Sequence, residues 1–309
     1  VIPGGEMVKF FKTGSEATSA AVRVARAHTG RDLILSSGYH GWHDWCVSNL
    51  AGVPGDVHAL TIPFMVGENN AGAAAVIVEP DTYSHGELIA LRSYCDATGA
   101  LVIFDEIVNG FRLAPGGRGE TAGVIPDLAT YSKALGNGYA IAAVVGRREV
   151  MSAFERVGVS GTYNGDTIGL AAAKAVIAKT GTTDYYGSIA SKGARLAEDF
   201  LAAGLSAGIP VSAPGHPTRW TPTFADDEAA VDPIIRDRAA RQPWKMLWRQ
   251  EMCLRGFLIG PGYVFSCYAH SDEDVERFLD ANRAAFRVLA SVDDPRELLI
   301  GDAAGGGVR

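Results

Sequence analysis

The segment Leu101-Val-Ile-Phe-Asp105 constrains the fold of this 309-residue chain most strongly. An apolar run that ends in a carboxylate is typical of a strand buried on both faces, as found in parallel sheets covered by helices. Proteins of this kind bind ligands at the carboxyl edge of the sheet. Taken alone, Asp105 could instead cap a helix or pair with an arginine. The segment therefore predicts an α/β fold with Asp105 at that edge.

A second stretch, residues 129–138, carries Lys133 between a short β-prone run and two glycines, Gly136 and Gly138, that interrupt regular structure. A lone lysine is more often a solvated surface residue. A lysine held on a turn away from charge partners can, however, lose its proton and attack a carbonyl. Lys133 and Asp105 at two strand ends fit pyridoxal phosphate (PLP): the amine forms an imine with the cofactor, and the carboxylate keeps its ring nitrogen protonated.

Further motifs accompany these two residues. They are Lys12–Ala17 (KTGSEA), Tyr39–Gly41 (YHG), Asp105–Arg112 (DEIVNGFR), Ser132–Ala134 (SKA) and Gly161–Thr162. In this order they make the chain similar to a class III aminotransferase of fold type I, in the branch of glutamate-1-semialdehyde aminomutase. Several ordered motifs are specific although each alone is weak. The resemblance implies an α/β fold with a mostly parallel central sheet flanked by helices, and a smaller α+β C-terminal domain.

The resemblance also assigns roles around the cofactor ring. Lys133 would be the catalytic residue and would bind PLP covalently as a Schiff base. Asp105 would contact the ring nitrogen. Tyr39 would stack on the ring, as aromatic side chains do by offset stacking, while His40 would support the loop.

The remaining site residues concern the cofactor phosphate. Gly14 and Ser15 lie at the start of a helix predicted over residues 15–28, with Ser15 as its N-cap. Backbone amides at a helix N-terminus suit a phosphate, and the resemblance assigns this role to both residues. Thr162 would reach the cofactor phosphate of the neighbouring subunit, which implies a homodimer with active sites shared across the interface.

The chain departs from the aminomutases at two positions. Gly262 stands where they carry a glutamate, and Ser84 stands where they place an asparagine near the phenolic oxygen of the cofactor. Ser84 or His85 could supply that hydrogen bond instead. The replacement at Gly262 favours an aminotransferase that moves an amino group between a small amino donor and a carbonyl acceptor, with a substrate of amino-acid or amino-sugar type. Glutamate-1-semialdehyde 2,1-aminomutase is the alternative.

Composition narrows the class of protein. A net charge of -7 argues against nucleic-acid binding, and no apolar run is long enough to span a bilayer. The four cysteines show no paired spacing typical of zinc or redox motifs, which is compatible with reduced thiols. We expect a cytoplasmic enzyme without a metal, a nucleic-acid partner or a membrane partner.

The domain organisation is predicted as a PLP-binding large domain over residues 1–180, a small domain over 181–300 and a flexible tail over 301–309. The chain opens with Val1 and reaches the KTGSEA motif at Lys12, whereas the family carries a further N-terminal segment before this point. We therefore expect an N-terminal truncation. A second alternative follows from it, a truncated inactive relative or a subunit that pairs with a complete partner.

Apolar periodicity predicts the individual elements. In the first part it predicts strands over 7–12, 33–37, 57–62, 74–79 and 141–146 and helices over 87–98, 147–157 and 167–179. In the second part it predicts helices over 184–205, 236–255 and 272–289 and strands over 219–224, 256–259 and 264–268. Glu106 and Arg112, which flank the site motif, are predicted to form structural ion pairs.

Overall fold

The computed structural model describes residues 1–309 apart from 48–49, 66, 68–71, 183, 225–242 and 301–309. Backbone contacts divide the chain into two compact units, Val1–Thr183 and Asp184–Arg309. The predicted boundary lies between residues 180 and 181, close to this division. The tail predicted over 301–309 lies outside the described residues.

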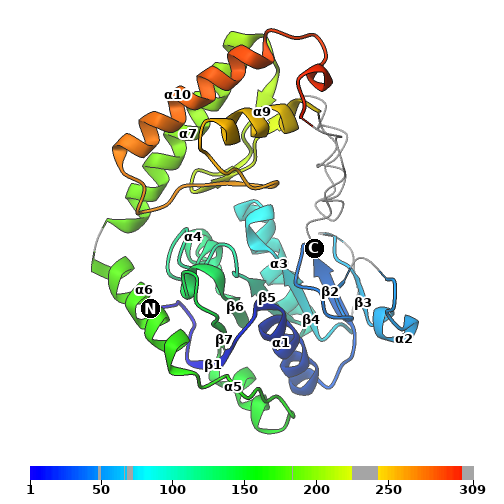
Figure 1. Ribbon diagram of the computed structural model, residues 1–309. Coiled ribbons are helices and arrows are strands. Elements are labelled where there is room, and N and C mark those ends of the chain that lie inside the picture. The colour runs from blue at the N-terminus through cyan, green and yellow to red at the C-terminus, as the bar shows by residue number, and fades with distance from the viewer. Residues whose placement is uncertain (48–49, 66, 68–71, 183, 225–242, 301–309) are drawn as a thin grey trace. The chain divides into compact units, whose positions relative to one another are not determined.

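A seven-stranded sheet in the order β1-β7-β6-β5-β4-β2-β3 forms the first unit (Figure 1). Its strands are β1 (Met7–Phe11), β2 (Ile34–Ser37), β3 (Thr61–Pro63), β4 (Ala75–Val78), β5 (Leu101–Asp105), β6 (Leu128–Tyr131) and β7 (Ala142–Gly146). Only β7 runs against its neighbours β1 and β6, and the other pairs are parallel. The mostly parallel sheet was predicted. Because of it, the carboxyl ends of β1, β2, β4, β5 and β6 lie at one edge.

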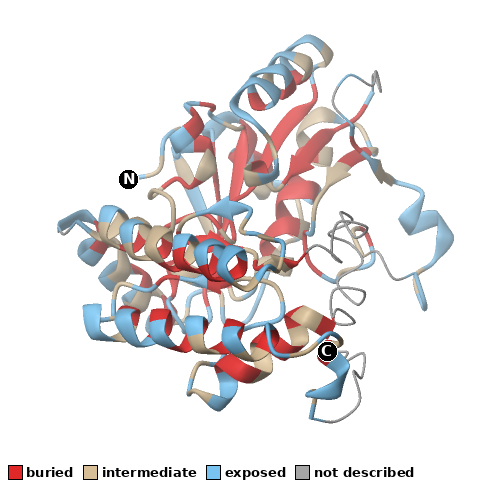
Figure 2. Cartoon of the chain, turned by 90° about the horizontal axis from the view of Figure 1, so that it is seen from above, coloured by how far each residue is buried: buried red, intermediate tan, exposed pale blue. Residues whose placement is uncertain are grey.

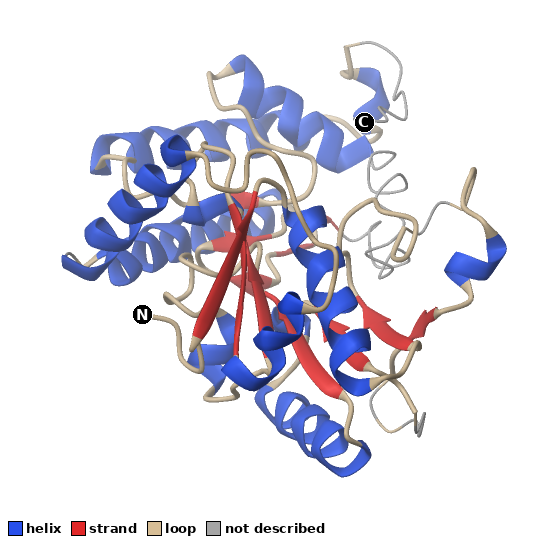
Figure 3. Ribbon diagram, turned by 90° about the horizontal axis from the view of Figure 1, so that it is seen from below, coloured by secondary structure: helices blue, strands red, loops and turns tan. Residues whose placement is uncertain are grey.

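Helices cover both faces of this sheet (Figure 3). One face packs against α1 (Gly14–Thr29) and α5 (Arg148–Met151), and the other against α3 (His85–Thr98) and α4 (Arg118–Ala122). Successive residues of β5 alternate between the faces: Leu101 and Ile103 pack on the side of α1, and Val102 and Phe104 on the side of α3. All of them are buried, as the strands of Figure 2 show, which explains the unbroken apolar run.

Two predicted elements of the first unit are wrong in part. The strand predicted over 57–62 is the short helix α2 (Gly55–His58) followed by β3. Pro54 precedes this helix and Asp56 lies in its first turn, both of which favour a helix start over a strand. The helix predicted over 147–157 is α5 followed by the 3-10 turn η3 (Ser152–Glu155). The helix predicted over 167–179 is α6 (Thr167–Thr182).

The second unit packs α7 (Tyr185–Ala207), α9 (Pro243–Leu254) and α10 (Asp272–Leu289) around short antiparallel strands. The strands are β8 (Val211–Ser212), β9 (Gly215–His216), β10 (Arg219–Trp220), β11 (Thr223–Phe224) and β12 (Val264–Phe265). In its core the ring of Phe200 lies 5.2 Å from the rings of Trp220 and Trp248 and 5.4 Å from that of Phe286. None of the helices described in either unit is long and apolar enough to cross a bilayer.

Three predictions for the second unit need correction. The strand predicted over 219–224 is divided, because β10 pairs with β9 and β12 whereas β11 pairs with β8. No strand forms over 256–259, where the chain leaves α9 through Gly256 at φ +89°. The helix predicted over 236–255 is described only from Pro243, and its first part lies outside the described residues.

Gly193 in α7 tests the packing of the second unit. A Cβ at this position would overlap the carbonyl oxygen of Pro217, a backbone atom that cannot rotate away. We expect Gly193→Ala to lower the free energy of unfolding by about 2 kcal/mol or more, as overpacking does. Gly86→Ala in α3 is the matched control, because nothing lies within 4 Å of a Cβ there. Urea denaturation of both variants measures the difference, and equal stabilities would contradict the packing described.

Candidate active site

The predicted site residues of the first unit lie where strands end at the carboxyl edge of the sheet. Gly14 and Ser15 follow β1, Tyr39 follows β2, Asp105 is the last residue of β5, and Lys133 follows β6. Residues scattered over more than a hundred positions of sequence are thereby placed at one edge. Open α/β sheets bind their ligands there.

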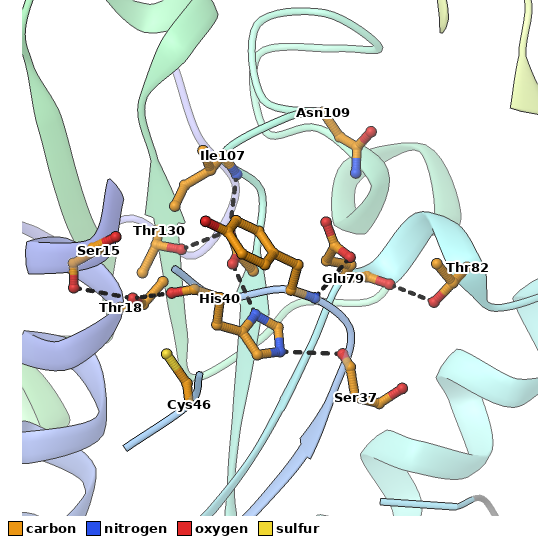
Figure 4. A network of polar contacts seen from close by, with 12 residues as sticks. Ser15, Thr18, Ser37, His40, Cys46, Glu79, Thr82, Ile107, Asn109 and Thr130 are labelled. Atoms are coloured by element: carbon orange, nitrogen blue, oxygen red, sulfur yellow. Dashed lines mark hydrogen bonds and ion pairs between the residues drawn. The ribbon is translucent and has the colours of Figure 1, made fainter. Parts of the chain in front are cut away.

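Asp105 carries the buried charge of this edge and is 4 % exposed. Its Oδ1 accepts hydrogen bonds from the amide of Ile107 at 3.2 Å and from the hydroxyl of Thr130 at 3.3 Å. Its Oδ2 lies 2.8 Å from Nδ1 of His40. Figure 4 labels the three partners, which belong to the loop after β2, the strand β6 and the loop after β5. A buried carboxylate is costly without such donors, and hydrogen bonds to its charged form stabilise that form.

The segment 38–47, which contains the aromatic motif, is fastened to α1. The hydroxyl of Thr18 donates to the carbonyl oxygen of His40 at 2.7 Å. Ser19 Oγ lies 2.7 Å from Nδ1 of His43 and accepts a hydrogen bond from the indole of Trp45 at 2.8 Å. These contacts fix the segment against the first turns of the helix.

Tyr39 is oriented through its backbone. Its amide donates to Oε2 of Glu79, just beyond β4, at 3.0 Å. The preceding Gly38 has φ +105°, and a Cβ there would lie 2.8 Å from the same oxygen, so glycine is required at this close approach. The side chain of Tyr39 is 49 % exposed and is therefore accessible to a ligand at the edge.

The N-terminus of α1 offers donors for an anion. Its N-cap is Thr13, not the predicted Ser15: Thr13 and Glu16 form a capping box, with the Thr13 amide donating to Glu16 Oε2 at 2.8 Å. The amides of Gly14 and Ser15 follow in the first turn, and no acceptor for them exists among the described residues. A Cβ on Gly14 would lie 2.7 Å from Cδ1 of Ile107. Glycine thus keeps this turn close to the loop that follows Asp105.

Lys133 has an unusual backbone. It is exposed, begins the 3-10 turn η2 (Lys133–Leu135) and has φ +45°. A residue with a side chain is strained in the left-handed region, and such strain collects at functional sites. Asp105 pairs with Thr130 across β5 and β6. The lysine therefore follows directly beyond the level of the buried carboxylate.

Thr162 is placed differently. It is exposed in the turn before α6, and within the described chain no hydrogen bond joins it to the other predicted site residues. The turn is nevertheless tied to the edge, because Nζ of Lys12 lies 2.6 Å from Oδ2 of Asp166 and donates to the carbonyl oxygen of Ala140 at 3.0 Å. Lys12 thus joins the turn of Thr162 to the turn that leads into α1.

Ser84 and His85, the two residues considered for a hydrogen bond to the phenolic oxygen of the cofactor, differ in their roles at the start of α3. Ser84 is the N-cap of α3, and its hydroxyl accepts a hydrogen bond from the amide of Glu87 at 3.3 Å. His85 is exposed at the first position of the helix. Both alternatives stay open.

Glu106 differs from its prediction as an ion-pair residue. It is 1 % exposed, and its two oxygens accept hydrogen bonds from the amides of Arg118 at 2.9 Å and Gly119 at 2.7 Å. These bonds hold the loop after Asp105 against the start of α4. Burial raises the pKa of Glu106 to about 8, against the opposing effect of the two amides.

Sequence reasoning missed the partners that orient the site. It gave His40 only the support of a loop, and assigned nothing to Thr130 or Glu79. His40 and Asp105 are 65 positions apart, so no local pattern pairs them. The sequence offered one signal for these residues, their position in the chain: each lies at or shortly after the carboxyl end of a β-prone segment.

Comparison with known proteins decides the family. Residues 56–207 match the family model of the class-III aminotransferases. The 3-aminobutyryl-CoA aminotransferase of Cloacimonas acidaminovorans (strain Evry) is 34% identical over 92% of this chain and 71% of its own length. The chain belongs to the class-III aminotransferases. It therefore shares their fold type and their dependence on pyridoxal phosphate, and the predicted family and cofactor are confirmed.

A second relative and a solved structure are also similar to this class-III aminotransferase. A glutamate-1-semialdehyde 2,1-aminomutase of Methanocaldococcus jannaschii is 31% identical over 93% of this chain and 76% of its own length. The solved structure of the PLP internal aldimine form of the FumI protein from Sphingopyxis sp. MTA144 matches with a TM-score of 0.85 at 26% identity, covering 96% of this chain and 75% of that chain. The predicted fold of a PLP transferase is thereby confirmed.

The raised pKa of Glu106 predicts a pH dependence of stability. Between its ordinary value of 4.5 and about 8, the folded chain keeps this proton whereas the unfolded chain has lost it. Stability must then fall as pH rises through this range, by at most about 1.4 kcal/mol per pH unit for one proton. Urea denaturation from pH 5 to 8 should show the decline in the wild type and a smaller decline in Glu106→Gln. Equal slopes would contradict a protonated Glu106.

Proposed function

We propose that this class-III aminotransferase transfers an amino group between a small amino donor, of amino-acid or amino-sugar type, and a carbonyl acceptor, with Lys133 as the catalytic residue. One observation carries the assignment: the strained backbone of Lys133 follows β6 at the edge where the neighbouring β5 ends in the buried Asp105. A strained lysine and a buried carboxylate on adjacent strand ends match the chemistry of the family cofactor.

The residues present fit pyridoxal phosphate. The amides of Gly14 and Ser15, at the positive end of the α1 dipole, would hold the phosphate. Asp105 would contact the ring nitrogen, because its carboxylate is buried and fixed by hydrogen bonds. The exposed ring of Tyr39 would stack on the cofactor. When bound, the cofactor supplies a protonated ring that withdraws electrons from the bonds of the carbon bearing the amino group.

Lys133 would act in two ways at this site. Its Nζ would hold the cofactor through the aldehyde carbon, as the Schiff-base lysines of such enzymes do, and would be released when a substrate amine binds. The freed Nζ would accept the proton from the substrate carbon that bears the amino group and, as general acid, donate it to the aldehyde-derived carbon of the cofactor. Because Nζ would be released next to the bound substrate, it would already lie within reach of the carbon on which it acts.

Transfer between two molecules is favoured over rearrangement within one. Gly262 offers no carboxylate at the position where aminomutases carry a glutamate. The 34% identical relative is named for aminotransfer. The aminomutase reaction stays the alternative, supported by the 31% identical relative of that name.

A homodimer with shared sites is part of the proposal. Thr162 is exposed, and the Lys12–Asp166 ion pair fastens its turn to the first unit. Apolar side chains lie exposed beside it, with Tyr163 at 71% and Ile168 at 62%. A second copy of the chain would cover these side chains and bring Thr162 to the phosphate of its partner.

The cytoplasmic location rests on the cysteines. Cys46, Cys95, Cys253 and Cys267 are all free thiols, which suits a reducing compartment. Burial raises the pKa of both Cys46 and Cys95 to about 12, so these two remain protonated and unreactive at neutral pH.

Lys133→Ala tests the catalytic assignment. A covalent bond between the lysine amine and PLP gives a visible absorbance band, and we expect this band in the wild type and its loss in the variant. Turnover should fall below detection, while the phosphate contacts retain part of the cofactor affinity. Absorbance spectra of both proteins with added PLP measure this. No band in either protein would contradict an active enzyme and favour an inactive relative.

Mixing two inactivated subunits tests the shared site. If Thr162 serves the partner's cofactor, a hybrid dimer of Lys133→Ala with Thr162→Val contains one complete site, formed by the intact Lys133 and the intact Thr162. Refolding the two variants together should restore activity that neither shows alone. Unchanged activity of the mixture, with hybrid dimers present on native mass spectrometry, would contradict sharing through Thr162.

A further inference from the structure

His40 touches Asp105 directly but has no part in the proposed chemistry. It is 1% exposed, and each ring nitrogen has a polar partner: Nδ1 lies 2.8 Å from Oδ2 of Asp105, and Nε2 lies 3.1 Å from the carbonyl oxygen of Ser37 (Figure 4). Trp45 stacks parallel to the imidazole, with ring centroids 6.4 Å apart and planes at 5°. Thr18 holds the backbone oxygen of the same residue at 2.7 Å.

These contacts fix the orientation of the imidazole. The carbonyl oxygen of Ser37 and the carboxylate of Asp105 both accept hydrogen bonds, so the ring is oriented with Nε2 toward Ser37 and Nδ1 toward Asp105. Rotation of the ring by 180° would place carbon atoms against both partners. Nδ1 is therefore held facing the carboxylate.

The contact spans the edge of the sheet. Ser37 ends β2 and Asp105 ends β5, and β4 lies between these strands in the sheet. The imidazole thus links two strands that are not neighbours. Within the described residues Oδ1 of Asp105 has two partners, Ile107 and Thr130, whereas Oδ2 has His40 alone. His40 decides how the second oxygen is held.

We propose that His40 is a positioning residue that fixes Oδ2 of Asp105 in the orientation in which this carboxylate meets the ring nitrogen of pyridoxal phosphate. The inference rests on the proposed role of Asp105. A carboxylate held through both oxygens loses little freedom when the cofactor binds, so the contact increases affinity as well as turnover. Trp45 and Thr18 preserve the arrangement by fixing the ring and its backbone.

Two substitutions of His40 separate its nitrogens. The amide of His40→Asn lies near the position of Nδ1 and can still donate to Asp105, whereas that of His40→Gln reaches the position of Nε2 and Ser37. Apoprotein is titrated with PLP, and binding is followed by the visible absorbance band. We expect His40→Gln to weaken PLP binding roughly tenfold or more, the loss of one hydrogen bond to a charged group, and His40→Asn to retain most of the affinity. The kcat of His40→Gln should fall more than its KM for the amino donor rises.

Matched variants identify the cause of any loss. His43→Gln alters a histidine of the same segment that contacts Ser19 instead of Asp105, and melting temperatures verify that each variant is folded. Equal losses in His43→Gln and His40→Gln would attribute the effect to the segment and overturn the proposal. An affinity that falls in Asp105→Asn but in neither His40 variant would overturn the role of His40 alone. An affinity unchanged in Asp105→Asn would instead overturn the proposed role of Asp105.

Discussion

The burial of the Asp105 carboxylate is the constraint on which the rest of the site depends. A charge taken out of water must find hydrogen-bond donors, and here they come from three separate parts of the chain: the loop after β2, the adjacent strand β6 and the amide of Ile107. The hydrogen bonds of this one side chain therefore join two loops and a strand end at the carboxyl edge. The helix-covered parallel sheet provides the rigid frame for this arrangement.

The α1 helix joins the phosphate end of the site to the aromatic end. Its first turn presents the amides of Gly14 and Ser15, and its second turn anchors the segment 38–47 through Thr18 and Ser19. Gly41, at φ +116°, packs so tightly against Ser15 that a Cβ would overlap the serine side chain. The start of α1 and the segment that carries Tyr39 are therefore in direct contact.

Two adjacent carboxyl groups have separate tasks because their surroundings differ. Asp105 accepts donors at the ligand edge, whereas Glu106 accepts the amides of Arg118 and Gly119 and so anchors the loop after β5. Burial dominates at Glu106 and raises its pKa to about 8. A single dipeptide at a strand end thus provides a candidate cofactor contact and the anchor of its loop.

The sequence by itself determined the fold class and the strand ends on which site residues lie. A strand buried on both faces needs apolar residues at consecutive positions, so a run such as Leu101–Phe104 is visible in the sequence. It also determined the family through motifs of fixed order. Only the tertiary structure paired His40 with Asp105 and Glu79 with Tyr39, since hydrogen bonds between distant loops leave no local periodicity. The tertiary structure also shows Thr13, instead of the predicted Ser15, as the N-cap of α1, and two strands in place of the one predicted over 219–224. Caps and pairings of two-residue strands depend on single contacts, which apolar patterns do not encode.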